Sequence, residues 1–355
     1  MRDQNGPTGV PQSLLWASDD APGFLKVGSW KFVSRFWSGN WEAYGPRTSC
    51  VDTFALSGKQ IFLFSDCKYH RVRWFVGKLT EERTLDVETE GIADWGRLYA
   101  SQSMDTPDGR RLLIGNIGHP GFCTGTKLLP IGGTDWNSML SYPRQIHLDA
   151  QSSRLTFAPA DELRTARVAS THVVVEPTTV SCGTPVALGS AQGNTREVRL
   201  SLQQWTNRTP GGSCGFQLRH ASNGSSASPE AGCVLEVMFT AAPSVVVRSW
   251  CGSPGSSHEK AECLAGSDDA FNKSSLAGYC YNISLPVPST ATNGPSELSA
   301  LIDRSVVEVF AAGGQVVISS GVFVDSESAT AVVELTCDSG GGAVMAAEGW
   351  MLLKQ

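Results

Sequence analysis

The stretch LIDRSVVEVFAAGG, residues 301–314, carries the clearest structural pattern in the chain. Apolar residues dominate 305–310, four small residues follow at 311–314, and a second apolar run covers 315–320. Two apolar segments of strand length, joined by a short turn that contains glycine, are typical of a β-hairpin. This part of the chain is therefore predicted to be antiparallel β-structure.

Segments of the same kind recur outward from this hairpin along the chain. They are short, apolar and separated by turn sequences such as Asp108-Gly109. Further strands are predicted at 31–33, 60–64, 72–76, 111–114, 144–148, 171–176, 198–202 and 298–303. A series of short strands predicts an all-β fold of the propeller or sandwich type.

The length and charge of the chain narrow the class of protein. Its 355 residues suffice for two domains, at about 100 to 200 residues per domain. The net charge is −6 and the basic residues are scattered, so we expect no nucleic-acid partner. No apolar run approaches the about 18 residues of a membrane span. The start, MRDQNGPTGV, lacks the apolar core of a signal peptide.

The cysteines and glycosylation sequons nevertheless indicate the secretory pathway. Seven of the ten cysteines follow residue 180, and none forms a CxxC pair typical of metal or redox sites. Four Asn-x-Ser/Thr sequons lie in the same half, at Asn207, Asn223, Asn272 and Asn282. We expect a glycoprotein of a secreted, vacuolar or other lumenal compartment, with a cysteine pairing that the sequence leaves open.

The character of the sequence changes at FAPADELRTAR, residues 157–167. Proline and acidic residues precede a leucine and basic residues, which is typical of a short helix. We therefore predict an N-terminal domain at 1–160, a linker helix at 161–170 and a C-terminal domain at 171–355.

Four segments resemble glycoside hydrolase family 32, the family of invertases, inulinases, levanases and fructosyltransferases. LIDRSVVEVFAAGG is similar to its C-terminal sandwich signature, and DELRTAR at 161–167 resembles the helix between its two domains. DWGRLYASQSMDTPDGRRLLIGNI at 94–117 resembles its D-x-G-x-x-Y-A-S segment with the strand that follows. WNSMLSYPRQIHLD at 136–149 resembles its W-x-x-x-x-S-x-P-R-x-L-x-L segment. The resemblance covers roughly residues 50 to 335, in the family's order.

The resemblance implies a five-bladed β-propeller that carries the active site, followed by a β-sandwich. A four-stranded blade takes about 40 to 45 residues, so residues 1–160 hold only about three or four blades. We therefore expect a partial propeller, in an N-terminally truncated or degenerate member of the family whose true start lies upstream of Met1.

In this family, hydrolysis with retention uses two carboxyl groups about 5 Å apart, a nucleophile and an acid that later acts as a base. TSCVDTFAL at 48–56 resembles the family's E-C-P-D-x-F-x-L strand and places Ser49 at the position of the acid/base Glu. The pKa of a serine hydroxyl is far too high to protonate a leaving oxygen, and loss of a general acid typically lowers the rate about 10²- to 10⁴-fold. The resemblance therefore implies a fructoside site without its acid.

Two neighbouring acids are alternatives to the missing Glu. Glu42 matches the family's W-E if an insertion displaces it, but the strand register would then have to be rebuilt. Asp52 lies three residues from Ser49 and would point to the opposite face of a regular strand. We interpret Ser49 as a true substitution of the acid and keep Glu42 as the alternative acid.

The first seven residues, MRDQNGP, match two family motifs. They resemble M-N-D-P-N-G-P, which would make Asp3 the nucleophile. They also resemble R-D-P, which would make Asp3 the acid that stabilises the transition state, with Arg2 in the substrate site. The distance along the chain from Asp3 to Cys50 favours the stabiliser. A frayed acidic terminus without a catalytic role is the third interpretation.

Asp94 precedes the family's G-x-x-Y segment, and the resemblance places it near the sugar as a substrate-binding residue. The alternative is a loop aspartate that caps a turn. Tyr99 is expected in the propeller core, and Asp303 and Arg304 in structural roles of the sandwich. Residues 211–215 fit the G-x-S-x-G pattern of serine hydrolases, but we expect them in a polar loop and assign them no catalytic role.

We interpret the chain as a family 32-like protein that acts on β-fructofuranosides, such as sucrose or fructans, by a retaining mechanism. The resemblance implies no cofactor. The six histidines show no spacing that suits zinc, so we expect no metal. A catalytically silent carbohydrate-binding relative and a truncated gene product are the alternatives. The sequence leaves open whether the chain turns over its sugar, and it leaves the oligomeric state open.

Overall fold

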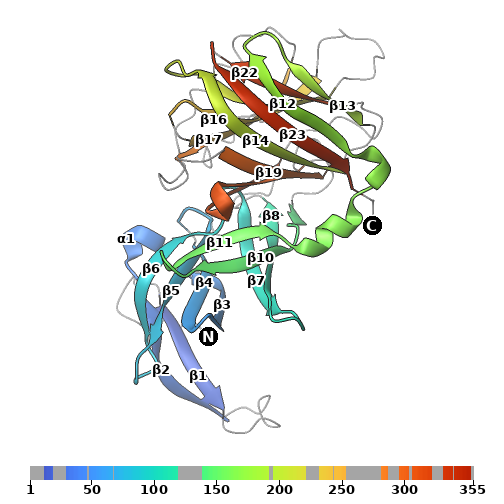
Figure 1. Ribbon diagram of the computed structural model, residues 1–355. Coiled ribbons are helices and arrows are strands. Elements are labelled where there is room, and N and C mark those ends of the chain that lie inside the picture. Colours follow the sequence, from blue (N-terminus) through green and yellow to red (C-terminus); the bar gives the residue numbers. More distant parts are fainter. Residues whose placement is uncertain are drawn as a thin grey trace.

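A computed structural model describes residues 12–18, 29–45, 48–66, 68–118, 138–191, 195–220, 232–242, 244–252, 281–286, 296–303, 306–321, 331–338 and 340–352. Most of these residues lie in strands, which confirms the predicted all-β class (Figure 1). Within the described ranges, the one α-helix is the four-residue α1 (Trp41–Tyr44). None of the helices there is long and apolar enough to cross a membrane.

The N-terminal half contains three antiparallel sheets, which lie below the sandwich in Figure 1. The first pairs β1 (Gln12–Ser18) with β2 (Trp30–Ser38). The second has the chain order β3 (Thr48–Leu56), β4 (Lys59–Asp66), β5 (Val72–Leu79) and β6 (Leu85–Ile92). The third has the order β11-β10-β8-β7, from β7 (Leu98–Asp105), β8 (Arg111–Gly118), β10 (Arg144–Asp149) and β11 (Arg154–Pro159), with β9 (Ser138–Leu140) on β8. Antiparallel sheets of about four strands are typical of propeller blades.

The linker consists of two 3-10 helices, η1 (Asp161–Ala166) and η2 (Ala169–Thr171). Hydrogen bonds between residues three apart hold them, such as Leu163 N–H to Ala160 O at 3.0 Å. Segments of only three to six residues are too short for an α-helix to be stable without packing, and such short connectors often take the tighter 3-10 form. The helix predicted at 161–170 is thus two separate 3-10 turns.

The C-terminal half is a sandwich of two six-stranded sheets. The first has the order β12 (Val173–Ser181), β23 (Gly342–Met351), β14 (Thr195–Asn207), β19 (Ser296–Asp303), β20 (Val306–Ala311) and β21 (Val316–Gly321). The second has the order β13 (Val186–Ala191), β22 (Ala331–Asp338), β15 (Ser213–His220), β16 (Gly232–Thr240), β17 (Ser244–Gly252) and β18 (Tyr281–Pro286). Apolar residues of both sheets form the core between them.

The hairpin predicted at 305–320 is confirmed as β20 and β21, with η4 (Ala312–Gly314) as its turn. This turn meets the propeller strand β11, as Figure 1 shows in orange-red. Gly314 has φ +84°, and a Cβ atom there would lie 2.1 Å from Phe157 O. Only glycine permits both this conformation and this close approach.

One buried apolar cluster continues from the propeller into the sandwich. Leu98, Ile146 and Phe157 belong to the propeller, and Val306 and Phe310 of the sandwich lie in the same cluster. All five side chains are at most 4 % exposed. The two domains therefore share a part of their core, and burial of apolar surface holds them together.

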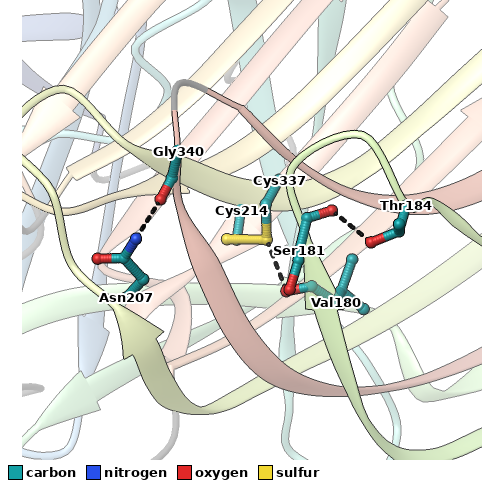
Figure 2. The surroundings of a disulfide bond; sticks show 7 residues. All are labelled: Val180, Ser181, Thr184, Asn207, Cys214, Cys337 and Gly340. Carbon is teal, nitrogen blue, oxygen red and sulfur yellow. Dashed lines mark hydrogen bonds between the residues drawn. A yellow bond between two sulfur atoms is a disulfide. The ribbon is translucent and has the colours of Figure 1, made fainter.

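A disulfide joins Cys214 of β15 to Cys337 of β22 inside the sandwich (Figure 2). The two cysteines are direct partners in the strand register, so their side chains point to the same face. Ser213, in the G-x-S-x-G segment, is 2 % exposed and begins β15, so the polar loop expected at 211–215 ends in a buried strand. Among the described cysteines, Cys50 and Cys182 form no disulfide.

Candidate active site

The strand that resembles the family's acid strand is β3, and it contains a β-bulge. Ser49 pairs with Ser65, Asp52 pairs with Leu63, and the register shifts between them. Cys50, within the bulge, has φ 51°. Because Ser65 and Leu63 lie on one face of β4, Ser49 and Asp52 also share that face. The expectation that Asp52 points away from Ser49 is wrong, because the bulge adds one residue to the regular alternation.

Asp52 is nevertheless occupied by structural contacts. Its Oδ2 atom accepts hydrogen bonds from Ser103 N–H at 2.8 Å and from the Ser103 hydroxyl. The guanidinium of Arg111 lies 3.7 Å from Oδ1 and also covers the ring of Phe54 at 3.9 Å. These contacts tie β3 to β7 and β8 in the next blade. Asp52 therefore holds two blades together, and it is poorly placed to donate a proton to a sugar.

Ser49 lies beside the phenol of Tyr99, which β7 supplies. The two side chains share a hydrogen bond. Burial raises the pKa of Tyr99, and the hydrogen bond from Ser49 offsets only part of that effect. The ring of His70 lies 6.3 Å from the Tyr99 ring. Two neutral hydroxyl groups thus lie together at the position where the motif resemblance predicts a carboxylic acid.

Asp66 is a second carboxylate near Ser49, because it pairs with Thr48 across the strands. It is fully buried, and its Oδ2 atom accepts a hydrogen bond from Arg73 Nε at 2.8 Å. Its Oδ1 atom accepts one from Tyr69 N–H at 2.6 Å. These contacts bind the carboxylate within its own blade, so Asp66 does not replace the missing acid in this arrangement.

The helix that carries Glu42 lies on the other face of this blade. Tyr44 of α1 packs against Trp37 at 5.4 Å and against Phe64 at 5.9 Å. Phe64 of β4 points away from the face that carries Leu63, Ser65 and Ser49, since neighbouring residues of a strand alternate. The side chain of Glu42 lies outside the described part of the structure, as do Arg2 and Asp3.

Asp94 lies at the interface between the domains and has no exposed surface. Its Oδ1 atom accepts hydrogen bonds from Gly96 N–H at 2.7 Å and from Ser319 N–H at 3.1 Å. Its Oδ2 atom accepts from Arg144 Nη1 at 2.7 Å and from Ser319 Oγ at 2.6 Å. These contacts match the alternative of an aspartate that caps a turn, and they leave no oxygen turned toward a sugar.

Arg144 and Glu308 complete this buried cluster, and neither was singled out from the sequence. Arg144 Nε and Nη2 donate to Glu308 Oε2 at 3.0 and 2.6 Å, and Tyr142 N–H donates to Oε1 at 2.6 Å. Burial raises the pKa of Glu308, and the charge of Arg144 counteracts it. One sequence signal could have found Glu308, because it is a lone acid within an apolar strand that is buried throughout.

Comparison with models of protein families identifies both halves of the chain. Residues 7–159 match the glycosyl hydrolases family 32 N-terminal domain, and residues 161–346 match the family 32 C-terminal domain. The chain belongs to glycoside hydrolase family 32. This confirms the resemblance and the fold class, a partial propeller followed by a sandwich.

Solved structures of family 32 members are similar to this chain. The β-fructofuranosidase of Bombyx mori is 18 % identical, with 98 % of this chain and 62 % of that chain covered and a TM-score of 0.62. Fructan 1-exohydrolase IIa of Cichorium intybus is 16 % identical, with 97 % and 67 % covered and a TM-score of 0.66. The exo-inulinase of Aspergillus awamori is 18 % identical, with 97 % and 62 % covered and a TM-score of 0.66.

At these identities the similarity shows the family 32 fold. The chain spans about three fifths of the length of the Bombyx mori enzyme. A search among curated proteins found no match.

Proposed function

We propose that this family 32 chain recognises β-fructofuranosides, such as sucrose or fructans, and that its retaining hydrolysis is impaired at the acid step. The observation that carries the proposal is the pair of Ser49 and Tyr99 at the position of the acid. The Bombyx mori enzyme has been solved with sucrose and the Cichorium intybus enzyme with 1-kestose, which supports the substrate class.

The retaining reaction needs a proton at two points. When the nucleophile attacks the anomeric carbon, the leaving oxygen takes a proton from the acid, and the same group later removes a proton from the attacking water. The hydroxyl of Ser49 and the phenol of Tyr99 are both too weakly acidic for the first step at neutral pH. Asp52 and Asp66 are held by Ser103 and Arg73. Bond cleavage is therefore slow, although the sugar can still bind.

The remaining site residues of this proposal are assigned from the sequence motifs alone. Asp3 is the stabiliser of the transition state, with the nucleophile as its alternative role, and Arg2 binds substrate beside it. Glu42 stays the alternative acid. Asp94 has no sugar-binding role in this proposal, because Ser319 and Arg144 occupy its carboxylate.

The compartment is part of the same proposal. The disulfide between Cys214 and Cys337 requires an oxidising environment to form and persist. Asn207, in one of the sequons, is exposed at the end of β14, and its Nδ2 atom donates a hydrogen bond to Gly340 O at 2.7 Å (Figure 2). Both features favour a secreted, vacuolar or other lumenal glycoprotein.

Hydrolysis of sucrose and inulin by the native chain and two variants tests the proposal. Ser49→Glu restores a carboxylic acid, and Ser38→Glu is the control because Ser38 is an exposed serine at the end of β2. We expect little release of reducing sugar from the native chain, about 10²- to 10⁴-fold more from Ser49→Glu, and no change from Ser38→Glu. Ordinary turnover by the native chain would contradict the assignment of Ser49.

A silent carbohydrate-binding relative is the second candidate, and the neutral Ser49–Tyr99 pair favours it because hydroxyl groups bind sugar hydroxyls without reacting. Sucrose at about 100 times its Kd would stabilise the folded chain by about 2.7 kcal/mol. Stabilisation by sucrose with no turnover in Ser49→Glu would favour this candidate over the impaired enzyme.

A further inference from the structure

Residues 94–97 connect β6 of one blade to β7 of the next, and their backbone lies against the sandwich. Trp95 N–H donates to Val317 O at 2.8 Å, and Arg97 N–H donates to Ser319 O at 2.7 Å. Both acceptors belong to β21, the last strand of its sheet. The propeller segment therefore covers the edge of the sandwich sheet with a short strand-like contact.

Gly96 allows this close contact, and Trp95 holds it in place. A Cβ atom on Gly96 would lie 1.9 Å from Ser319 O, so the backbones can approach in this way only with glycine there. Trp95 packs against the apolar core of the sandwich. On the propeller side, the guanidinium of Arg71 lies 5.1 Å from the centre of the Trp95 ring. Contacts with both domains thus hold the segment.

Ser319 binds the same segment through its side chain. Its hydroxyl donates to Asp94 Oδ2 and accepts from Arg144 Nη2, at 2.6 Å in both cases. Ser319, Asp94 and Arg144 are all fully buried. Ser319 therefore bonds the segment at Asp94 with its side chain and at Arg97 with its backbone carbonyl.

We propose that the sandwich positions Tyr99 in the candidate site through Ser319 and Asp94. Tyr99 follows Arg97 by two residues and shares its hydrogen bond with Ser49. The next residue, Ala100, donates its N–H to Ser65 Oγ at 2.9 Å, across from Ser49. A displacement of residues 94–97 therefore moves the phenol relative to Ser49. Ser319 and Asp94 are positioning residues, and their role in sugar recognition rests on the function proposed above.

Fluorine NMR of the full chain labelled with 3-fluorotyrosine reads this geometry directly. The chain has six tyrosines, and loss of one resonance in Tyr99→Phe assigns Tyr99. Ser319→Ala is compared with Ser320→Ala. Both serines are fully buried on β21, but Ser319 pairs with Glu308 on the side of the propeller, whereas Ser320 pairs with Val307 of the sandwich core. Each change removes one buried hydroxyl from one strand, so general destabilisation affects both.

We expect the Tyr99 resonance to move by more than its linewidth in Ser319→Ala and to stay in place in Ser320→Ala, both recorded without sugar. Sucrose affinity, measured separately by calorimetry, is expected to fall about tenfold in Ser319→Ala alone, equivalent to about 1.4 kcal/mol. An unmoved resonance in Ser319→Ala, or an equal movement in both variants, overturns the proposal.

If Ser319→Ala does not fold, Asp94→Asn provides the same comparison, because it keeps the shape of the side chain and changes its bonds to Ser319 and Arg144. A moved Tyr99 resonance in Asp94→Asn then supports the proposal, and an unmoved one overturns it. Since the resonance is recorded without sugar, a failure to bind sucrose would count against the proposed function and would leave the positioning result intact.

Discussion

Replacing Arg144 by methionine perturbs the ionic cluster between the domains most strongly. The guanidinium is fully buried and lies 2.7 Å from Asp94 and 2.6 Å from Glu308. Arg144→Met keeps an unbranched side chain but leaves two buried carboxylates without a cation. Removal of one partner from a buried ion pair typically costs about 3 to 5 kcal/mol. Because two acids lose their partner here, we expect the free energy of unfolding to fall by about 5 kcal/mol.

Thermal unfolding of the full chain, followed by circular dichroism, measures this cost. A chain of this size loses about 2 to 4 °C in Tm per kcal/mol, so we expect Arg144→Met to melt about 10 to 20 °C lower. The control is Arg164→Met, since Arg164 pairs with Asp161 at 3.1 Å while both side chains are mostly exposed. An exposed pair contributes at most about 1 kcal/mol. Equal losses in the two variants would refute the reasoning.

Two further predictions concern pH and the interdomain turn. Burial raises the pKa of Glu308, so the folded state holds a proton there more tightly than the unfolded state does, and this contribution to stability is present at low pH and is lost as the pH rises through the folded pKa. We therefore expect the free energy of unfolding in urea to fall less between about pH 4 and 7 in Glu308→Gln than in the native chain. An equal fall in the two proteins would contradict this role of Glu308. Gly314→Ala should destabilise the chain by about 1 to 3 kcal/mol more than Gly109→Ala. Both glycines have positive φ, but only Gly314 faces Phe157 O, so similar losses would show that the close approach is unimportant.

Much of the fold could be predicted because it follows from local patterns. The apolar runs and the glycine turn of 305–320 form the hairpin that they predict, and β3 spans the motif that places Ser49. The bulge in β3 could not be foreseen. Cys50 adopts a positive φ that its residue type does not favour, in a strand that pairs with β4 and bonds to β7 through Asp52 and Ser103.

The buried cluster at the interface lay beyond the sequence for a different reason. Asp94 is 50 residues from Arg144 and 225 from Ser319, and nothing in either segment indicates that they meet. The motif resemblance placed Asp94 near the sugar because a motif compares only residues that are neighbours in the sequence. The partners of a buried carboxylate depend on how the two domains pack, and only the folded structure shows this packing.

The central claim is that Ser49 removes the general acid, and two leaving groups compared on the native chain and on Ser49→Glu test it. The 4-nitrophenolate of a 4-nitrophenyl β-fructofuranoside leaves without a proton, whereas the glucose oxygen of sucrose needs one. We predict that the preference for the nitrophenyl substrate, as a ratio of kcat/KM values, is about 10²- to 10⁴-fold larger in the native chain than in Ser49→Glu. Equal ratios in the two proteins would contradict the claim.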